Sequence, residues 1–302
     1  MTTSGQLWPV AVFAHNEANS IIKCLETVLA NRVAGQAMEI HVLANACSDN
    51  TEQLVRDFAR TEPCVHLHSI VVGDKANAWN CYIHDFSPDS DVHFFIDGDV
   101  EASAGALAAL ADALAQQPHV NAAAALPVSG RAKDVTRATM LAQADLAGNL
   151  YALSGDFVRR LRAGAVKMPV GFIGEDSLVG AFAKYDLDTS KGWNDGLIVP
   201  VAAAGFYFDS LNWRHARDWR LYWNRRIRYS MRTIQLHAFR KLIQAHGFQA
   251  MPAHVRDLYP DVNRLGPIGE HGENPLFDFL AKRRIRKQYG PQPIVPQPVG
   301  VR

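Results

Sequence analysis

Short apolar runs alternate with segments of helical hydrophobic spacing through the first 130 residues of the chain. The first apolar run covers residues 7–15, and residues 18–31 follow it with Ile21, Leu25 and Val28 at helical spacing. Four further apolar runs lie in residues 39–45, 65–72, 91–97 and 120–128. Such alternation predicts an α/β fold, in which crossover helices join strands of a mostly parallel sheet and cover both of its faces.

Beyond residue 130 the pattern is less regular. Residues 171–185 indicate a glycine-rich turn that leads into a helix, and residues 197–208 indicate one or two buried strands. After about residue 250, proline and glycine become frequent, which is typical of a loop or tail. The length of 302 residues allows one large domain or two small ones.

Composition excludes several classes of protein. The formal net charge is only +1, which argues against a dedicated nucleic-acid binder. No uninterrupted apolar run reaches membrane-spanning length, and the N-terminus shows no basic-then-apolar leader. The four cysteines are widely spaced, without a Cys-x-x-Cys pair, which favours a reducing cytoplasm over a zinc cluster or a disulfide scaffold.

Residues 214–241 form a basic segment with nine Lys or Arg residues and one acid. An apolar stripe at helical spacing runs through it: Trp219, Trp223, Ile227, Met231 and Ile234. Core packing is the simpler interpretation of this stripe. Alternatively, the segment could face anionic lipid, with Trp219, Tyr222 and Trp223 at the interface. Peripheral association with the inner face of the membrane therefore stays open for a cytoplasmic protein.

Polar clusters follow four of the predicted strands, in residues 15–17, 45–49, 73–75 and 97–99. Ligands of open α/β sheets bind beyond the carboxyl ends of the strands, so these clusters predict a binding rim. In an extended chain Asp97 and Asp99 share a face, and Gly98 between them permits close approach of a ligand. Two adjacent acids repel each other unless a cation or donor compensates them. The alternative is a solvated turn after a strand.

Seven segments, taken in order, carry a resemblance to a known family. They lie in residues 10–28, 42–55, 73–80, 94–100, 151–161, 174–182 and 225–229, and they include the sequences "AHNEA", "GDKAN", "FFIDGDV", "GEDSL" and "RRIRY". The chain resembles inverting glycosyltransferases of family 2, which have the Rossmann-like GT-A fold and use nucleotide-sugar donors. The resemblance implies a hexosyltransferase whose catalytic domain is residues 1–250. Its nucleotide-sugar-binding half would be residues 1–130 and its acceptor half residues 131–250, with residues 251–302 as a helical or irregular extension.

The resemblance implies a metal site and a donor site. Asp99 would bind Mn²⁺ or Mg²⁺, and Asp97 would hold the ribose or share the metal through water. His215 is a further candidate metal ligand, although a surface histidine on a basic helix is equally consistent with the sequence. The donor-binding set implied by the family is Ala14, Asn16, Glu17, Asn45, Lys75, Asp97, Gly98, Asp99, Arg225 and Arg228.

The catalytic assignment falls on Asp176, with Glu175 beside it. An inverting transfer needs a carboxylate that takes the proton of the acceptor hydroxyl, and Asp176 would be this base. The alternative is that both acids only stabilise the first turn of a helix. For Lys75, Arg225 and Arg228 the alternative to phosphate binding is a solvated basic face.

Two departures from the family pattern affect specificity. Asn45 stands where the family usually has an Asp that reads the donor base, so the base preference is open, because an amide can donate as well as accept. Arg225 and Tyr229 replace Gln and Trp in the last motif, which weakens an inference of processive polymer synthesis.

The expected partners are a nucleoside-diphosphate sugar and a glycan, lipid-linked or small-molecule hydroxyl acceptor, without nucleic acid. A nucleotidyltransferase that makes sugar nucleotides is an alternative, although the turn after the first run lacks the glycine-rich loop such enzymes show. A non-catalytic membrane-surface module on a degenerate transferase fold is the third possibility.

Overall fold

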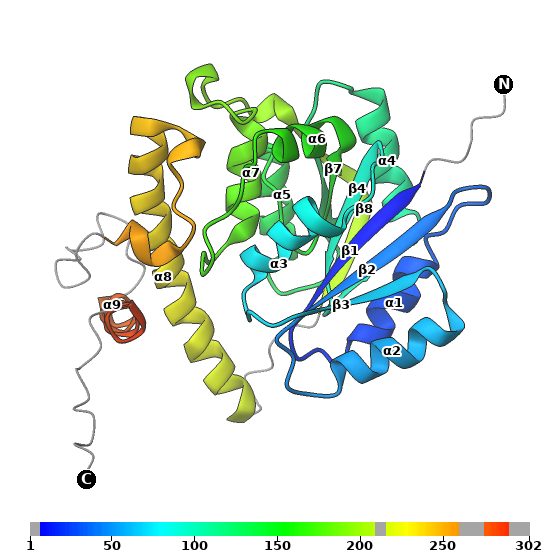
Figure 1. Ribbon diagram of the computed structural model, residues 1–302, viewed down its shortest axis with the longest axis horizontal. Coiled ribbons are helices and arrows are strands. Elements are labelled where there is room, and N and C mark those ends of the chain that lie inside the picture. The colour runs from blue at the N-terminus through cyan, green and yellow to red at the C-terminus, as the bar shows by residue number, and fades with distance from the viewer. Residues whose placement is uncertain (1–6, 209–215, 260–274, 290–302) are drawn as a thin grey trace, which may run out of the picture.

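An eight-stranded sheet forms the centre of the molecule in the computed structural model, which describes residues 7–208, 216–259 and 275–289 (Figure 1). The strand order is β3-β2-β1-β4-β7-β6-β8-β5. Strands β5 and β7 run opposite to the other six, so the expected mostly parallel α/β sheet is confirmed.

The first half of the sheet follows the predicted alternation. Four parallel strands are joined by helices: β1 (Trp8–Ala14), α1 (Ile21–Leu29), β2 (Met38–Asn45), α2 (Thr51–Thr61), β3 (Val65–Ile70), α3 (Lys75–Cys81) and β4 (Val92–Asp97). A π-helical turn, η1 (Tyr82–Phe86), continues α3. Because these strands are parallel, their carboxyl ends lie at one edge of the sheet.

The second half contains elements that the sequence pattern indicated, such as the helix in residues 171–185 and the strand in residues 197–208, and others that it did not. Its strands and helices are β5 (Val100–Ala102), α4 (Ala106–Gln116), β6 (Ala122–Pro127), α5 (Lys133–Gln143), β7 (Leu150–Ser154), α6 (Gly155–Ala163), α7 (Glu175–Lys184) and β8 (Ile198–Phe208). Strand β7 pairs antiparallel with both β4 and β6, and residues 198–208 form one strand. The short β5 and the largely exposed α5 carry too few apolar residues to be visible as a period.

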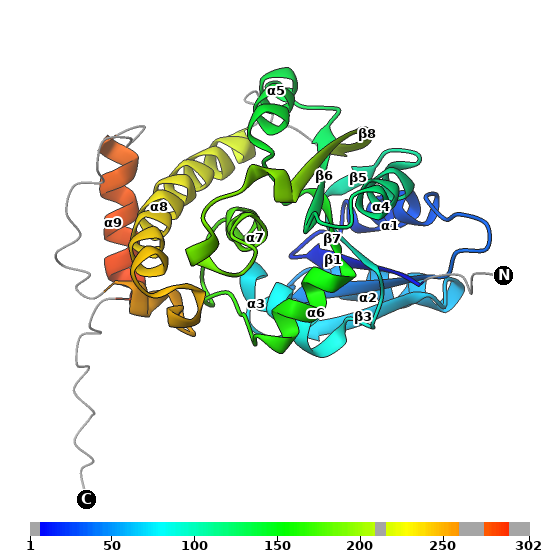
Figure 2. The ribbon, with the colours of Figure 1, turned by 90° about the horizontal axis from the view of Figure 1, so that it is seen from above.

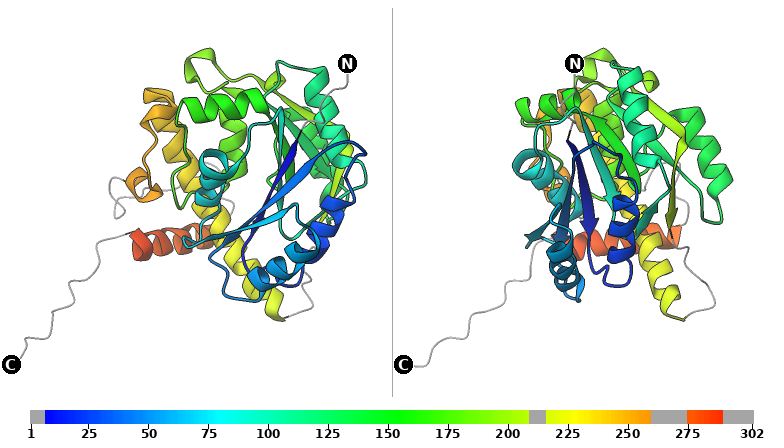
Figure 3. Two further views of the ribbon diagram at one scale, coloured as in Figure 1. Left: turned by 45° about the vertical axis from the view of Figure 1, so that its right-hand side comes forward. Right: turned by 90° about the vertical axis from the view of Figure 1, so that its right-hand side faces the viewer.

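Helices cover both faces of the sheet (Figure 3), and an apolar core lies on each face. Alternate residues of β1 point to opposite cores, so that Val12 packs with α1 and α4 while Phe13 packs with α3 and α7. On the Phe13 side, Trp79 of α3 is fully buried and donates to the Tyr151 hydroxyl of β7 at 3.1 Å. This aromatic core fixes α3 against the centre of the sheet.

The C-terminal part packs on the Phe13 side through a long helix, α8 (Ala216–His246), and α9 (Pro275–Tyr289), which lies beside it (Figure 2). Short 3₁₀ turns complete the described chain: η2 (Thr189–Lys191), η3 (Asp195–Leu197), η4 (Phe248–Ala250) and η5 (Val255–Leu258). Val255, Ala281 and Ile285 are completely buried in the same core as Phe13. The part of the extension that the structure describes is therefore packed onto the domain, where the proline and glycine content had predicted a loop or tail.

The stripe on α8 divides into two parts. Met231 and Ile234 are buried, as core packing requires, and Ile227 is partly buried. Trp219 and Trp223 are instead 56% and 41% exposed, so the core-packing interpretation is wrong for the two tryptophans. No helix in the described part of the chain is long and apolar enough to cross a membrane.

The junction between β7 and α6 tolerates only glycine. A Cβ on Gly155 would lie 1.9 Å from the Ser90 carbonyl oxygen, while a Cβ on Gly180 of α7 would meet nothing within 4 Å. We therefore expect Gly155→Ala to lower the free energy of unfolding by at least about 2 kcal/mol, because backbone must move. Gly180→Ala should be neutral or stabilising by up to about 1 kcal/mol, since alanine favours a helix interior. Urea denaturation of both variants measures the difference, and equal stability would contradict the assigned contact.

Candidate active site

The predicted rim exists, and its floor is built by close packing of β1 and β4. Asp97 ends β4, and the Gly98 amide donates to the Phe13 carbonyl oxygen at 2.8 Å. A Cβ on Gly98 would lie 3.1 Å from that oxygen and 3.3 Å from the Ala14 Cβ. Ala14 of the predicted donor-binding set is buried. Glycine at position 98 is thus required by the packing as well as by access of a ligand.

The loops after β1 and β2 are tied together by side chains from the predicted donor-binding set. Asn16 has a φ of 59°, and its Oδ1 accepts from the Ser48 and Asp49 amides at 2.7 and 3.3 Å. The Glu17 amide donates to the Thr51 hydroxyl at 2.8 Å. Burial raises the pKa of Glu17, although a hydrogen bond from Ser20 opposes this. These contacts hold the two loops in place independently of any ligand.

Asn45 has a structural role that the sequence did not reveal. Its side chain is buried, and Oδ1 accepts from the Asp74 amide at 2.8 Å. Asp74 is the N-cap of α3 and accepts from the Asn77 amide at 2.8 Å. Asn45 therefore positions the start of α3, where Lys75 lies.

Lys75 joins the rim to α7. Its Nζ lies 2.5 Å from Asp97 Oδ1 and 2.5 Å from Glu175 Oε1, and all three side chains are less than a third exposed. The predicted phosphate ligand is therefore an ion-pair partner of two acids, one from β4 and one from the first turn of α7. Residues far apart in sequence are brought together here by a single ammonium group.

Lys75, Asp97 and Glu175 shift one another's pKa values. Burial lowers the pKa of Lys75, but Asp97 and Glu175 more than offset this and hold it well above its usual value. Burial raises the pKa of Glu175, yet the Lys75 charge outweighs it and the pKa is lowered. For Asp97, burial and the charges of Glu175 and Asp99 prevail over Lys75 and raise the pKa to about 7.

Asp97 and Asp99 do not continue one extended strand. The chain turns at Gly98 and Asp99, and Asp99 is exposed, whereas Asp97 is only 25% exposed and faces Lys75. The shared-face geometry predicted for an extended chain is therefore wrong at Asp99. The acids still interact, because the charge of Asp99 contributes to the raised pKa of Asp97.

The carboxylate oxygens at the rim suit a hard cation whose coordination shell is completed by a bound substrate. The described residues contain no group of three or more His, Cys, Asp or Glu side chains placed to hold a metal. Mg²⁺ and Mn²⁺ prefer oxygen, and Mg²⁺ is commonly held by one or two carboxylates together with substrate phosphates and water. Asp99 and the second oxygen of Asp97 fit such a site. His215 lies outside the described residues.

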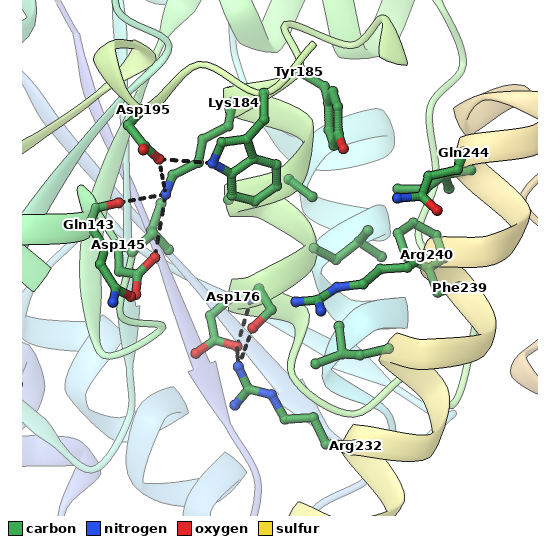
Figure 4. Close-up of a pocket in the computed structure, with 18 residues that line it drawn as sticks. Gln143, Asp145, Asp176, Lys184, Tyr185, Asp195, Arg232, Phe239, Arg240 and Gln244 are labelled. Carbon is green, nitrogen blue, oxygen red and sulfur yellow. Dashed lines mark hydrogen bonds and ion pairs between the residues drawn. The ribbon is translucent and has the colours of Figure 1, made fainter. Parts of the chain in front are cut away.

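Asp176 lines a cavity of about 720 Å³ between α7 and α8 (Figure 4). Its Oδ1 accepts from Arg232 Nη2 at 3.0 Å. Burial and the neighbouring Glu175 raise the pKa of Asp176, and Arg232 opposes the rise. Gly174, with a φ of 91°, lies so close to Arg232 that a Cβ would meet its guanidinium. A carboxylate with a raised pKa in the lining of a cavity can accept a proton.

Arg232 was missed by the sequence analysis, which selected Arg225 and Arg228 on the same helix. Those two side chains are exposed and form no ion pair with Asp97, Glu175 or Asp176 in the described structure. Arg232 follows Arg228 by one helical turn, so the helical spacing of the basic segment already made it a candidate. Which of these arginines points inward depends on how α8 packs.

Solved structures share this arrangement of sheet and helices. The mannosyltransferase PcManGT from Pyrobaculum calidifontis, in complex with GDP-Man and Mn²⁺, is 19% identical with a TM-score of 0.59, and the match covers 95% of this chain and 83% of that chain. TarS 1-349 from S. aureus, in complex with UDP-GlcNAc, is 13% identical with a TM-score of 0.50, over 93% of this chain and 91% of that chain. These similarities show the GT-A fold. No curated protein matches the sequence.

The family model described as glycosyl transferase family 2 matches residues 10–169, more than half of the chain. The matched segment contains β1 to β4 and every rim residue named above except Glu175. The assignment favours a glycosyltransferase over the nucleotidyltransferase and binding-module alternatives. The chain belongs to glycosyl transferase family 2.

Proposed function

We propose that this glycosyltransferase moves a sugar from a nucleoside-diphosphate sugar at the rim to a hydroxyl acceptor in the cavity beside Asp176. The observation that carries the proposal is the chain of contacts from Asp97 through Lys75 to Glu175, the chain neighbour of Asp176, and it supports a donor rim adjacent to the acceptor cavity. Glycosyl transfer needs both substrates within reach of one base, and this contact brings the two sites together.

The division of the chain supports separate donor and acceptor halves. The rim uses Asn16, Asn45, Asp97 and Asp99, all within residues 1–130, while the cavity is lined by residues between 143 and 244. We infer that residues 1–130 bind the donor and residues 131–250 bind the acceptor. Residues 251–259 and 275–289 pack in the same apolar core as α8 and form no part of the cavity lining.

We propose that the transfer proceeds with inversion and that Asp176 is the base on the acceptor side. As the acceptor oxygen attacks the anomeric carbon, Asp176 takes its proton, and the bond to the diphosphate breaks on the opposite face of the sugar. Burial and Glu175 raise the pKa of Asp176, which strengthens it as a base, and the Arg232 contact favours its ionised form. A divalent cation at Asp99 and Asp97 would neutralise the leaving diphosphate. Lys75 holds Asp97 and Glu175 in place between the two substrates.

PcManGT is solved with GDP-Man and TarS with UDP-GlcNAc, so donors with both bases belong in the screen. We expect one of these donors with Mn²⁺ to raise the melting temperature, because ligand at 100 times its Kd stabilises by about 2.7 kcal/mol. Asp99→Ala should lose the Mn²⁺-dependent part of this shift. Asp89→Ala, which removes an exposed acid paired with Arg159, is the control. An unchanged shift in Asp99→Ala would rule out the metal assignment.

Asp176→Asn should lower kcat by about 10²–10⁴-fold, because the amide cannot take the proton of the acceptor. Donor binding should be unchanged, since Asp176 faces the cavity. Release of nucleoside diphosphate measures the rate, and calorimetry measures donor affinity. Asp112→Asn, an exposed acid on α4, serves as the matched control. Full turnover by Asp176→Asn would exclude it as the base, and NMR of the anomeric proton in the product tests inversion.

Lys75→Met should lower the free energy of unfolding by about 2–4 kcal/mol, because two partly buried carboxylates lose their counter-charge. Adding Glu175→Gln should recover part of that loss by removing one of the two charges. Lys133→Met, an exposed lysine on α5, should have little effect. Denaturation curves of the three variants and the wild type measure these differences in the free energy of unfolding. A double variant less stable than Lys75→Met would argue against the bridge.

A further inference from the structure

Among the residues that the structure describes, one cation lining the cavity beside Asp176 has no partner. Six charged side chains line it: Asp145, Asp176, Lys184, Asp195, Arg232 and Arg240. Five of them are engaged with one another, as the distances below show. The remaining side chain, Arg240, makes no ion pair or hydrogen bond within the described chain.

Lys184 neutralises the wall opposite α8. Its ammonium is almost fully buried and lies 2.8 Å from Asp195, 3.4 Å from Asp145 and 2.7 Å from the Gln143 carbonyl oxygen. Figure 4 shows these four groups clustered on one side of the cavity, away from Arg240. Arg232 pairs with Asp176 at 3.0 Å. In neither of these two clusters does a carboxylate contact Arg240.

Arg240 projects from α8 into the cavity, above the Asp176–Arg232 pair (Figure 4). It follows Arg232 by two helical turns, so the two arginines are about 12 Å apart along the helix axis. An unpaired guanidinium presents several N–H donors in a planar fork that matches a carboxylate or phosphate. Such a group in the same cavity as a candidate base suits a molecule that carries both a hydroxyl and an anion.

Apolar side chains complete the lining of the cavity. Leu236, Phe239 and Ile243 line the cavity from α8, and Trp193 lines it from the loop before η3. Trp193 packs edge-on against Tyr185, with ring centroids 5.3 Å apart, and donates to Asp195 at 2.9 Å, so its ring is held in position. The cavity of about 720 Å³ is within the size range of small-molecule sites.

We propose that the acceptor of this enzyme is a small hydroxyl compound with an anionic group, a carboxylate or a phosphate, which Arg240 binds while the hydroxyl faces Asp176. The proposal rests on the proposed function, since it takes Asp176 as the acceptor end of the cavity. It narrows the acceptor from any hydroxyl compound to the anionic class.

The test measures anion binding without donor, metal or turnover, so its result is separate from that of the Asp176 experiment. Inorganic phosphate and malonate are titrated by calorimetry into wild type, Arg240→Gln, Arg240→Lys and Lys241→Gln. Lys241 is the next residue on α8, is exposed and does not line the cavity, so its variant removes the same charge outside the site. Phosphate held at the donor rim contributes equally to all four proteins and cancels in the comparison.

We expect the wild type to bind at least one of the two anions and Arg240→Gln to weaken that binding at least about tenfold, because it removes charged hydrogen bonds. Arg240→Lys should be intermediate, since it keeps the charge and loses the fork. Lys241→Gln should bind as the wild type does. Phosphate binding alone assigns a phosphorylated acceptor, and malonate binding alone assigns a carboxylate.

Three results would overturn the proposal: no anion binding by the wild type, equal affinity in wild type and Arg240→Gln, or an equal loss in Lys241→Gln. The last would indicate general attraction to the basic helix. Near-native melting temperatures of the variants would show that they are folded, which is expected because Arg240 is exposed and unpaired.

Discussion

The Lys75 ammonium between Asp97 and Glu175 is the contact on which the arrangement of the active site depends. Both distances are 2.5 Å, and the three side chains come from α3, β4 and α7. Two acids placed this close in a partly buried setting repel each other, and the attraction of each acid to the lysine outweighs that repulsion. Without such a counter-charge, the first turn of α7, which carries Asp176, would be driven away from the end of β4.

The position of Lys75 is itself fixed from two sides. On the rim side, Asn45 accepts from the Asp74 amide, and Asp74 caps α3, so the helix can start only at residue 75. On the core side, Trp79 of α3 is completely buried and bonds to Tyr151 of β7. Lys75 also lies 5.6 Å from the centroid of the Phe13 ring, a cation–π contact at the end of β1. Polar contacts at the rim and aromatic contacts in the core thus both fix the start of α3.

The sequence alone predicted the parts of the fold that repeat a simple period. Strands β1 to β4 and helices α1 to α3 follow from apolar runs and helical spacing, and the rim follows from where those strands end. The structure of the rim was less predictable, because Asn16, Asn45 and Lys75 bond to protein groups that are remote in sequence. The inward position of Arg232, the exposure of Trp219 and the burial of Ile285 all depend on how α8 packs, and no local pattern encodes that packing.

In the proposed function the two substrates would draw on different parts of the chain, and such a separation has a physical basis. A nucleoside diphosphate presents the same charges whatever sugar it carries, and the rim that would receive it lies almost entirely in the segment that matches the family, residues 10–169. Most of the cavity lining lies beyond residue 175, outside that segment. There the polar contacts are made by side chains of α7, α8 and the loop around Trp193, which can change without disturbing the sheet. An unpaired arginine in such a wall costs the fold little, because part of its side chain stays in water, while any acceptor that fails to reach it forfeits a charged hydrogen bond.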